Sequence, residues 1–222
     1  MELEQDDITF WSKRLEDHTA LLFILIDPSR ANDLKLMAYQ ELHNWNLYFE
    51  NPNINTLNQL IPRLSDLKHD VLELSKISQI NLVLPHEDFN SQVDHMIEEL
   101  VFFLRLLSGE MTAEEELAFW KQESAEHTEL ASHLIPFIPM MPQVAEELKV
   151  NSAEAVQRLK SLTDPYALLP VYQWSNQIAL KLDRLIQEGD KNAVQDLFHM
   201  IVEHEIKEGT RGAIRIRQLT GM

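Results

Sequence analysis

The chain has 222 residues, of which 45% are hydrophobic and only five are glycine. This composition is typical of a globular protein, and it argues against a sheet of many strands, because tight hairpin turns need glycine. The lack of cysteine excludes disulfides, cysteine zinc sites and iron–sulfur clusters, so histidine and carboxylate would have to hold any metal. The formal net charge of −17 disfavours nucleic acid and anionic lipid as partners.

The first residues, MELEQDD, are acidic, which argues against a signal or transit peptide. The longest apolar run, ALLFILI, is far too short to cross a bilayer. We therefore expect a cytoplasmic protein that does not span a membrane.

Apolar residues recur at helical spacing along nearly the whole chain, and prolines and polar clusters divide it into eight predicted helices. The first four cover residues 8–26, 31–49, 56–80 and 91–107. The last four cover residues 112–135, 143–162, 166–188 and 192–219. Thr112 and Glu115 predict a capping box at the start of the fifth helix. We expect the sixth helix to be interrupted at residues 149–154 and the seventh to bend at Pro170.

Two similar phrases indicate an internal duplication. FWSKRLEDHT occupies residues 10–19 and FWKQESAEHT residues 119–128, so His18 and His127 are 109 residues apart. The same offset links DHMIEE in the fourth predicted helix with EHEIKE in the eighth, pairing His95 with His204 and Glu99 with Glu208. We predict an all-α protein of two tandem four-helix bundle repeats, residues 1–110 and 111–222.

The histidine of each phrase follows a tryptophan by seven residues, which places both side chains on one helix face. In the first phrase that face also carries leucines, so His18 points into an apolar stripe, and His127 does the same in the second. The simpler interpretation is a core histidine bonded to a carbonyl. Recurrence in both phrases keeps a metal-binding role open.

His95 and Glu99 are four residues apart, as are His204 and Glu208, so each pair shares one helix face. An imidazole nitrogen and a carboxylate oxygen placed in this way can reach one metal ion. The alternative is a pair on the surface. Apolar neighbours in the same stripes indicate that both pairs face inward, where an unpaired carboxylate is costly.

Lys68 and Lys181 also lie in apolar stripes. A lysine in such a place usually extends its ammonium to water, and the alternative is an inward lysine paired with Glu99 or Glu208. Other candidates are weaker. Glu123 lies one turn before His127 but has Arg14 as its counterpart at the offset, and His86 is expected in a loop. The second repeat offers no clear counterpart of Glu41 or Glu73, and no histidine stands at the offset from His43, His69 or His133.

The opening FW…DH, the Leu67-Lys68 pair, LVLPHEDFNSQVDHMIEEL at residues 82–100 and their echoes in the second half resemble the Bacillus cereus metalloprotein-like family. The resemblance covers residues 10–219. It implies a duplicated all-helical domain of unknown function that binds metal by histidine and carboxylate. The chain departs from the family in its short sixth helix and in Gly209 and Gly212, where larger residues are expected, which puts the packing of the second repeat in doubt.

Together these features predict a metal-binding helical-bundle protein whose reaction, if it has one, the sequence does not name. Four histidines and two glutamates suffice for a dinuclear centre between the repeats; the competing layout is one metal per repeat, completed by water, Glu41 or Glu73. Iron suits these ligands best, with manganese or zinc as alternatives. An iron enzyme that handles oxygen or peroxide is one class of function. The other is a non-catalytic scaffold or interaction protein whose repeated histidines are core residues. Metal ions are the predicted partners, and a homodimer is compatible with the sequence. The predicted metal ligands are His18, His95, Glu99, His127, His204 and Glu208.

Overall fold

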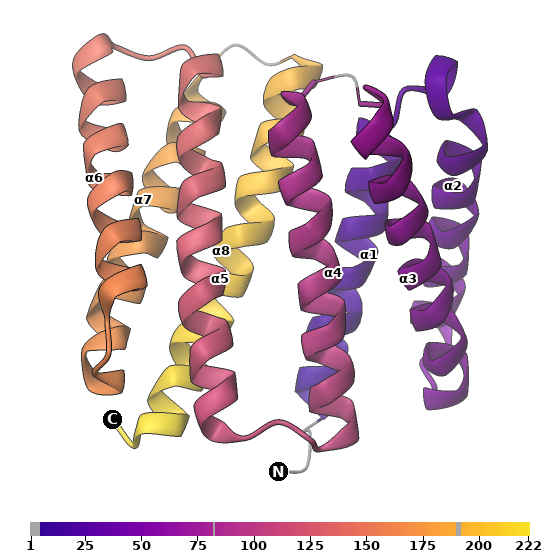
Figure 1. Ribbon diagram of the computed structural model, residues 1–222, viewed down its shortest axis with the longest axis horizontal. Coiled ribbons are helices and arrows are strands. Elements are labelled where there is room, and N and C mark those ends of the chain that lie inside the picture. Colours follow the sequence, from indigo (N-terminus) through magenta and orange to yellow (C-terminus); the bar gives the residue numbers. More distant parts are fainter. Residues whose placement is uncertain (1–4, 82, 190–191) are drawn as a thin grey trace. The chain divides into compact units, whose positions relative to one another are not determined.

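The computed structural model describes residues 5–81, 83–189 and 192–222, and within these residues the fold is all-α, as predicted (Figure 1). Residues 1–4, from the acidic start, and Leu82, from the stretch that resembles a family, lie outside the described residues. The chain divides into two compact units, Met1–Met111 and Thr112–Met222. The internal duplication and the repeat boundary stay predictions.

The first unit contains four long helices: α1 (Gln5–Leu25), α2 (Pro28–Glu50), α3 (Ile54–Ile77) and α4 (His86–Ser108). Each helix packs against the next in the chain, and α4 also contacts α1, which closes a four-helix bundle (Figure 1, indigo to magenta). Short connections between α1, α2 and α3 make these helices antiparallel neighbours. The core between them is apolar, with Trp11, Trp45, Phe89 and Phe103 among its largest side chains.

The second unit contains α5 (Ala113–Leu134), α6 (Pro142–Ser161), α7 (Leu168–Glu188) and α8 (Ala193–Thr220). Short 3₁₀ turns, Ile135–Phe137 and Pro165–Ala167, precede α6 and α7. Helix α5 contacts all three other helices, and α7 packs against both α6 and α8. The predicted capping box at the start of α5 is confirmed, because the Thr112 side chain accepts from the Glu115 backbone and the Glu115 carboxylate accepts from the Thr112 backbone.

Several predicted helix bounds are wrong. Helix α4 begins at His86, so this histidine is helical rather than in a loop, because Pro85 occupies the position before the first turn and starts the helix early. Helix α3 ends at Ile77 instead of residue 80. Helix α6 is continuous through the stretch where an interruption was expected. Pro170 is the third residue of α7, where a backbone N–H has no partner within the helix, so the predicted bend is not needed.

Gly209 and Gly212 mark a close approach of α8 to the side chains of its neighbours. A Cβ atom on Gly212 would lie 2.0 Å from the Tyr172 hydroxyl oxygen and 2.7 Å from a ring carbon of Trp120. A Cβ on Gly209 would lie 2.7 Å from the Asn176 amide oxygen. The doubt that these glycines raise about the packing of the second repeat is therefore removed at these two positions, because side chains of α5 and α7 fill the space that they leave.

Candidate functional site

In the first unit, α1 and α4 bring two histidines to one carboxylate. His18 Nε2 lies 2.9 Å from Glu99 Oε2, and His95 Nε2 lies 2.6 Å from Glu99 Oε1. All three residues are buried, His18 and Glu99 completely. The spacing of four residues on α4 brings His95 onto Glu99, and the face of α1 that carries Trp11 brings in His18. The structure thus places the three predicted ligands of this unit side by side.

Lys68 of α3 points into the same cluster and is completely buried. Its Nζ atom lies 3.0 Å from His18 Nδ1, and it also donates to the backbone carbonyl of Met96. The expectation that this lysine extends to water is wrong. A charged lysine has only donors, so His18 Nδ1 accepts from it and His18 Nε2 carries the hydrogen that faces Glu99. A chain of hydrogen bonds thus runs from Lys68 through His18 to Glu99.

In the second unit, α5 and α8 repeat this convergence. His127 Nε2 and His204 Nε2 lie 3.4 Å and 3.3 Å from the same oxygen of Glu208, Oε2. All three side chains are buried. His127 Nε2 also lies 3.0 Å from Oε1 of Glu123, one turn earlier on α5. The structure therefore brings together the three predicted ligands of the second unit and adds a fourth group.

Glu123 is the residue that the sequence comparison set aside. Its counterpart at the offset, Arg14, is not an acid, and Arg14 pairs instead with Asp17 at 2.8 Å. The signal that identifies Glu123 is local: it stands four residues before His127, the spacing that puts two side chains on one helix face. The search for pairs of identical or similar residues at the offset of 109 did not select Glu123, because its counterpart is Arg14.

The other residues considered from the sequence play no part in these clusters. Lys181 is not inward: its side chain is 43% exposed and pairs with Glu147 at 2.7 Å. Glu73 is 74% exposed, so the interpretation of it as an inward carboxylate is wrong. Glu41 is buried, and the Arg63 guanidinium pairs with it. His43, His69 and His133 are exposed.

Tyr172 of α7 shows the electrostatic effect of the second cluster. Burial raises the pKa of this phenol well above its usual value of 10.0, and the negative charges of Glu123 and Glu208 raise it further. Its hydroxyl lies 3.5 Å from the backbone carbonyl of Glu208, to which it donates. Tyr172 therefore stays a neutral donor across the physiological pH range, next to the helix turn that carries Glu208.

The donor types of both clusters fit a divalent metal ion. Imidazole nitrogen and carboxylate oxygen without sulfur are ligands that iron, manganese and zinc accept. The buried groups that could take part in holding such an ion are His18, His95, Glu99, Glu123, His127, His204 and Glu208. In both units the ring nitrogens that face the carboxylate are Nε2 atoms, one of the two positions through which a neutral imidazole binds metal.

The chain matches no family model, no curated protein and no solved structure. Among its described residues, no helix is long and apolar enough to cross a membrane. The chemistry of the two clusters is therefore the basis for any functional assignment.

Proposed function

We propose that the chain is a metal-binding helical protein in which His18, His95, Glu99, His127, His204 and Glu208 bind divalent metal. One observation carries the proposal: in each unit, two histidine Nε2 atoms lie next to one buried glutamate. Membership of the Bacillus cereus metalloprotein-like family, with which the repeated motifs agree, is part of the same proposal.

The cost of burying these groups supports metal binding. A carboxylate removed from water is unfavourable unless positive charge and hydrogen bonds compensate it. A divalent ion provides that compensation, and its binding energy then stabilises the fold. Iron is the metal that the proposal names first, with manganese and zinc as alternatives. A bound ion of this kind would supply Lewis-acid chemistry and lower the pKa of a bound water.

The finer form of the proposal is a dinuclear centre to which both repeats contribute ligands, and one ion per repeat is its alternative. The ligand count favours the shared centre, since three predicted ligands per repeat are fewer than a metal with four to six ligands usually has. One ion per repeat would need water or another carboxylate to complete its coordination. The proposal also includes a cytoplasmic location and the absence of a nucleic-acid partner, and it is compatible with a homodimer.

A second candidate is a metal-free scaffold, and the Lys68 hydrogen bond favours it for the first unit. A histidine that binds metal through Nε2 usually donates Nδ1–H to an acceptor, whereas Lys68 donates to Nδ1 of His18. In the scaffold, His18 is a core residue that donates Nε2–H to Glu99. Metal analysis of single variants separates the two candidates.

The test is elemental analysis of the full chain purified without a histidine tag, with metal counted per chain. His18→Ala and His127→Ala each remove one proposed ligand, and His43→Ala is the control because His43 is exposed on α2. We expect metal in the parent and the control and a loss of metal in both ligand variants. Unfolding in urea, in the presence of a chelator, reports the stability change of each variant separately.

The size of the loss decides the layout. Similar and nearly complete losses in both ligand variants indicate a shared centre, whereas retention of about half the metal by each indicates separate sites. If both variants keep the full metal content of the parent and lose only stability, about 1–3 kcal/mol for a buried hydrogen bond, the ligand assignment is wrong and the scaffold is the better description.

A further inference from the structure

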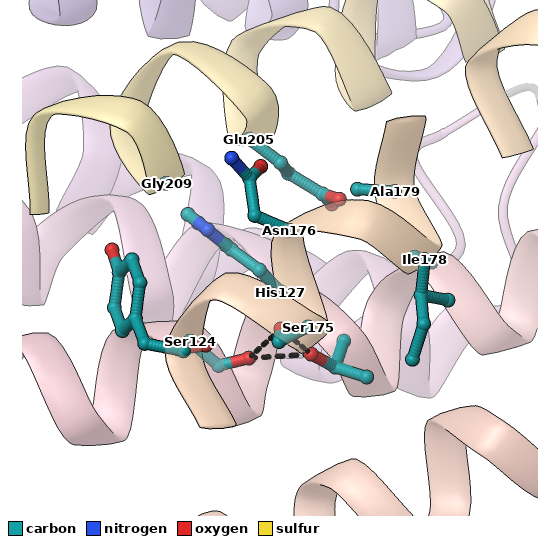
Figure 2. Close-up of a pocket in the computed structure, with 11 residues that line it drawn as sticks. Ser124, His127, Ser175, Asn176, Ile178, Ala179, Glu205 and Gly209 are labelled. Atoms are coloured by element: carbon teal, nitrogen blue, oxygen red, sulfur yellow. Dashed lines mark hydrogen bonds between the residues drawn. The ribbon is translucent and has the colours of Figure 1, made fainter. Parts of the chain in front are cut away.

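Two cavities of the second unit differ in size and in surroundings. The cavity beside His127, one of the proposed metal ligands, has a volume of about 20 Å³, which is room for a single water (Figure 2). A larger cleft, of about 270 Å³, lies between the end of α7 and the start of α8. The residues that line this cleft are Ile186, Gln187, Gln195, Asp196 and His199. None of them is a proposed metal ligand, so the cleft is a separate place for a ligand.

A carboxylate of α7 fixes the imidazole of His199 at this cleft. Nδ1 of His199 lies 2.6 Å from Oδ1 of Asp183, whose side chain is 13% exposed. The other oxygen of Asp183, Oδ2, accepts a hydrogen bond of 2.7 Å from the Gln187 amide. An ionised carboxylate only accepts, so Nδ1 of His199 carries the hydrogen of its bond to Asp183. In the neutral imidazole, Nε2 is then the nitrogen with a lone pair.

This arrangement is typical of a histidine that binds metal. Such a histidine usually coordinates through one ring nitrogen and donates the other N–H to a carboxylate or a carbonyl. His199 donates Nδ1–H to Asp183, whereas His18 accepts at Nδ1 from Lys68. Within the described residues, Nε2 of His199 makes no hydrogen bond. The alternative is an ordinary ion pair between an imidazolium and Asp183.

Asp196 supplies a second possible ligand next to this imidazole. It precedes His199 by three residues on α8, the spacing that places two side chains on one helix face. Both residues line the cleft, and an acid three residues before a histidine is a ligand pair of helical carboxylate-metal proteins. Asp196 is exposed and has no cationic partner in the described part of the chain. Its carboxylate is therefore available to an ion.

Gln195 adds an independent sign of an occupant. It lines the cleft, and only 6% of its surface is exposed. Its Nε2 lies 3.5 Å from the Phe137 carbonyl, while its Oε1 accepts no hydrogen bond from the described residues. A buried acceptor without a donor is unfavourable. Water bound to a cation is such a donor, and the cleft has room for several waters, since each takes about 30 Å³ in the liquid.

The charge at the cleft favours a cation. Ile186 and Gln187 belong to the last turn of α7, whose carbonyl end carries a partial negative charge. The N-terminal end of α8 carries the opposite partial charge, so the two helix ends offset each other. The carboxylates of Asp183 and Asp196 then decide the sign, which is negative.

We propose that this cleft binds one divalent transition-metal ion through Nε2 of His199 and the carboxylate of Asp196, with water in the remaining positions. Asp183 positions the imidazole and does not contact the ion. Imidazole suits zinc, nickel or copper, whereas magnesium keeps oxygen ligands. The site lies outside the clusters of the proposed function and does not rest on it.

The test is a zinc titration of the full chain, stripped with a chelator, followed by nitrogen NMR of labelled histidine rings. The Nε2 signal of His199 is identified by its loss in His199→Gln. Zinc should shift this signal, and magnesium at the same concentration should not. A His199 signal that zinc leaves unchanged overturns the proposal. The other histidine signals report the central clusters, so failure of one proposal is visible without the other.

Two variants test the carboxylates. Asp196→Asn removes the charged ligand, and Asp183→Asn weakens the group that positions the imidazole. Each should raise the zinc dissociation constant, measured from the His199 signal, by about 10–100-fold. The matched control is Glu146→Gln, which removes the same charge at an exposed position of α6 and should leave the constant unchanged. If both aspartate variants bind zinc as tightly as the parent, zinc binds only to an exposed imidazole and the proposed site is wrong.

Discussion

The two units surround their central histidines with different charges. In the first, His18 lies between the Glu99 carboxylate and the Lys68 ammonium, so one negative and one positive group flank it. In the second, His127 lies near Glu208 and Glu123 and lines a cavity together with Glu205. Each unit thus has two histidines next to one glutamate. The first unit adds a buried lysine, and the second adds further carboxylates.

This difference indicates that a buried ammonium stabilises the first cluster, whereas the second cluster has no lysine at the corresponding contact with its histidine among the interactions of His127 described above. A buried ion network is costly when one partner is removed, because the group left behind stays desolvated. The comparison therefore yields variants that should behave differently in the two units.

The largest expected effect is that of Lys68→Met, which removes the ammonium but keeps a side chain of similar length. His18 Nδ1 and the Met96 carbonyl then lose a buried donor, and each lost bond of this kind costs about 1–3 kcal/mol. We expect the free energy of unfolding to fall by about 2–4 kcal/mol, measured by urea unfolding in the presence of a chelator.

Lys181→Met is the matched control, since the sequence places both lysines in apolar stripes. The pair of Lys181 with Glu147 is exposed, and such pairs contribute about 0–1 kcal/mol. If both variants lose a similar free energy of unfolding, the buried hydrogen bonds of Lys68 contribute no more to stability than the exposed pair of Lys181 does.

The two lysines also show how far periodicity can predict a site. The spacing of three to four residues correctly places Lys68 in a buried stripe, because Leu64, Val71 and Leu72 are all buried, but it did not predict that the ammonium also stays inside. Lys181 shares its predicted stripe with Trp174, Ile178 and Leu185, of which only Ile178 is buried.

The buried face of α7 runs instead through Tyr172, Ser175, Ala179, Leu182 and Ile186. The predicted stripe that contains Lys181 therefore lies part of a turn away from the buried face of α7.

The offset of 109 residues predicts which histidines and glutamates come together, but it misses groups that only one unit has. His95 and His204 each meet a glutamate four residues later, as periodicity requires. Glu123 and Glu205 have Arg14 and Met96 as counterparts, so comparison of the halves removes them from consideration. Their role depends on which side chains face them across the bundle, and that information is absent from a one-dimensional pattern.

A second contrast lies in how the units fill their cores. Phe103, 109 residues before Gly212, is completely buried in the first unit, whereas the second has glycine in α8 and fills the space with Tyr172 from α7. Gly212→Ala should therefore lower the free energy of unfolding by about 1–3 kcal/mol through overpacking, even though alanine favours helices. Urea unfolding measures this loss.

Gly189→Ala is the control for Gly212→Ala, because the nearest atom to a Cβ at Gly189 is 3.4 Å away. It should be neutral or stabilise by up to about 1 kcal/mol. Tyr172→Phe removes the oxygen that Gly212→Ala meets at 2.0 Å, so the double variant should recover part of the loss. Strict additivity of the two changes would show that the clash is not with the hydroxyl.

The smallest expected effect concerns the first turn of the second helix in each unit. Helices α2 and α6 both begin with proline, but the residue before Pro28 is Asp27, which accepts from the Ser29 backbone, whereas Met141 before Pro142 offers no side-chain cap. Met141 is 68% exposed, so a polar residue fits there. Met141→Asp should raise the free energy of unfolding by about 0.5–2 kcal/mol, the usual contribution of an N-cap.

The pH dependence of this contribution follows from Asp27. Hydrogen bonds from the Ser29 hydroxyl and backbone lower the pKa of the Asp27 carboxyl below its usual value of 3.8. Such a group stabilises the fold fully above the pKa of the unfolded chain, and the contribution is lost as the pH falls through the lower folded value. Asp27→Asn keeps an N-cap side chain but cannot titrate. The free energy of unfolding of this variant should therefore change less between pH 5 and about pH 2 than that of the parent. Met141→Asp should add to the pH dependence in the same interval. An unchanged pH profile in Met141→Asp, together with unchanged stability at pH 7, would show that α6 takes no cap at this position and that the two units differ in more than one side chain there.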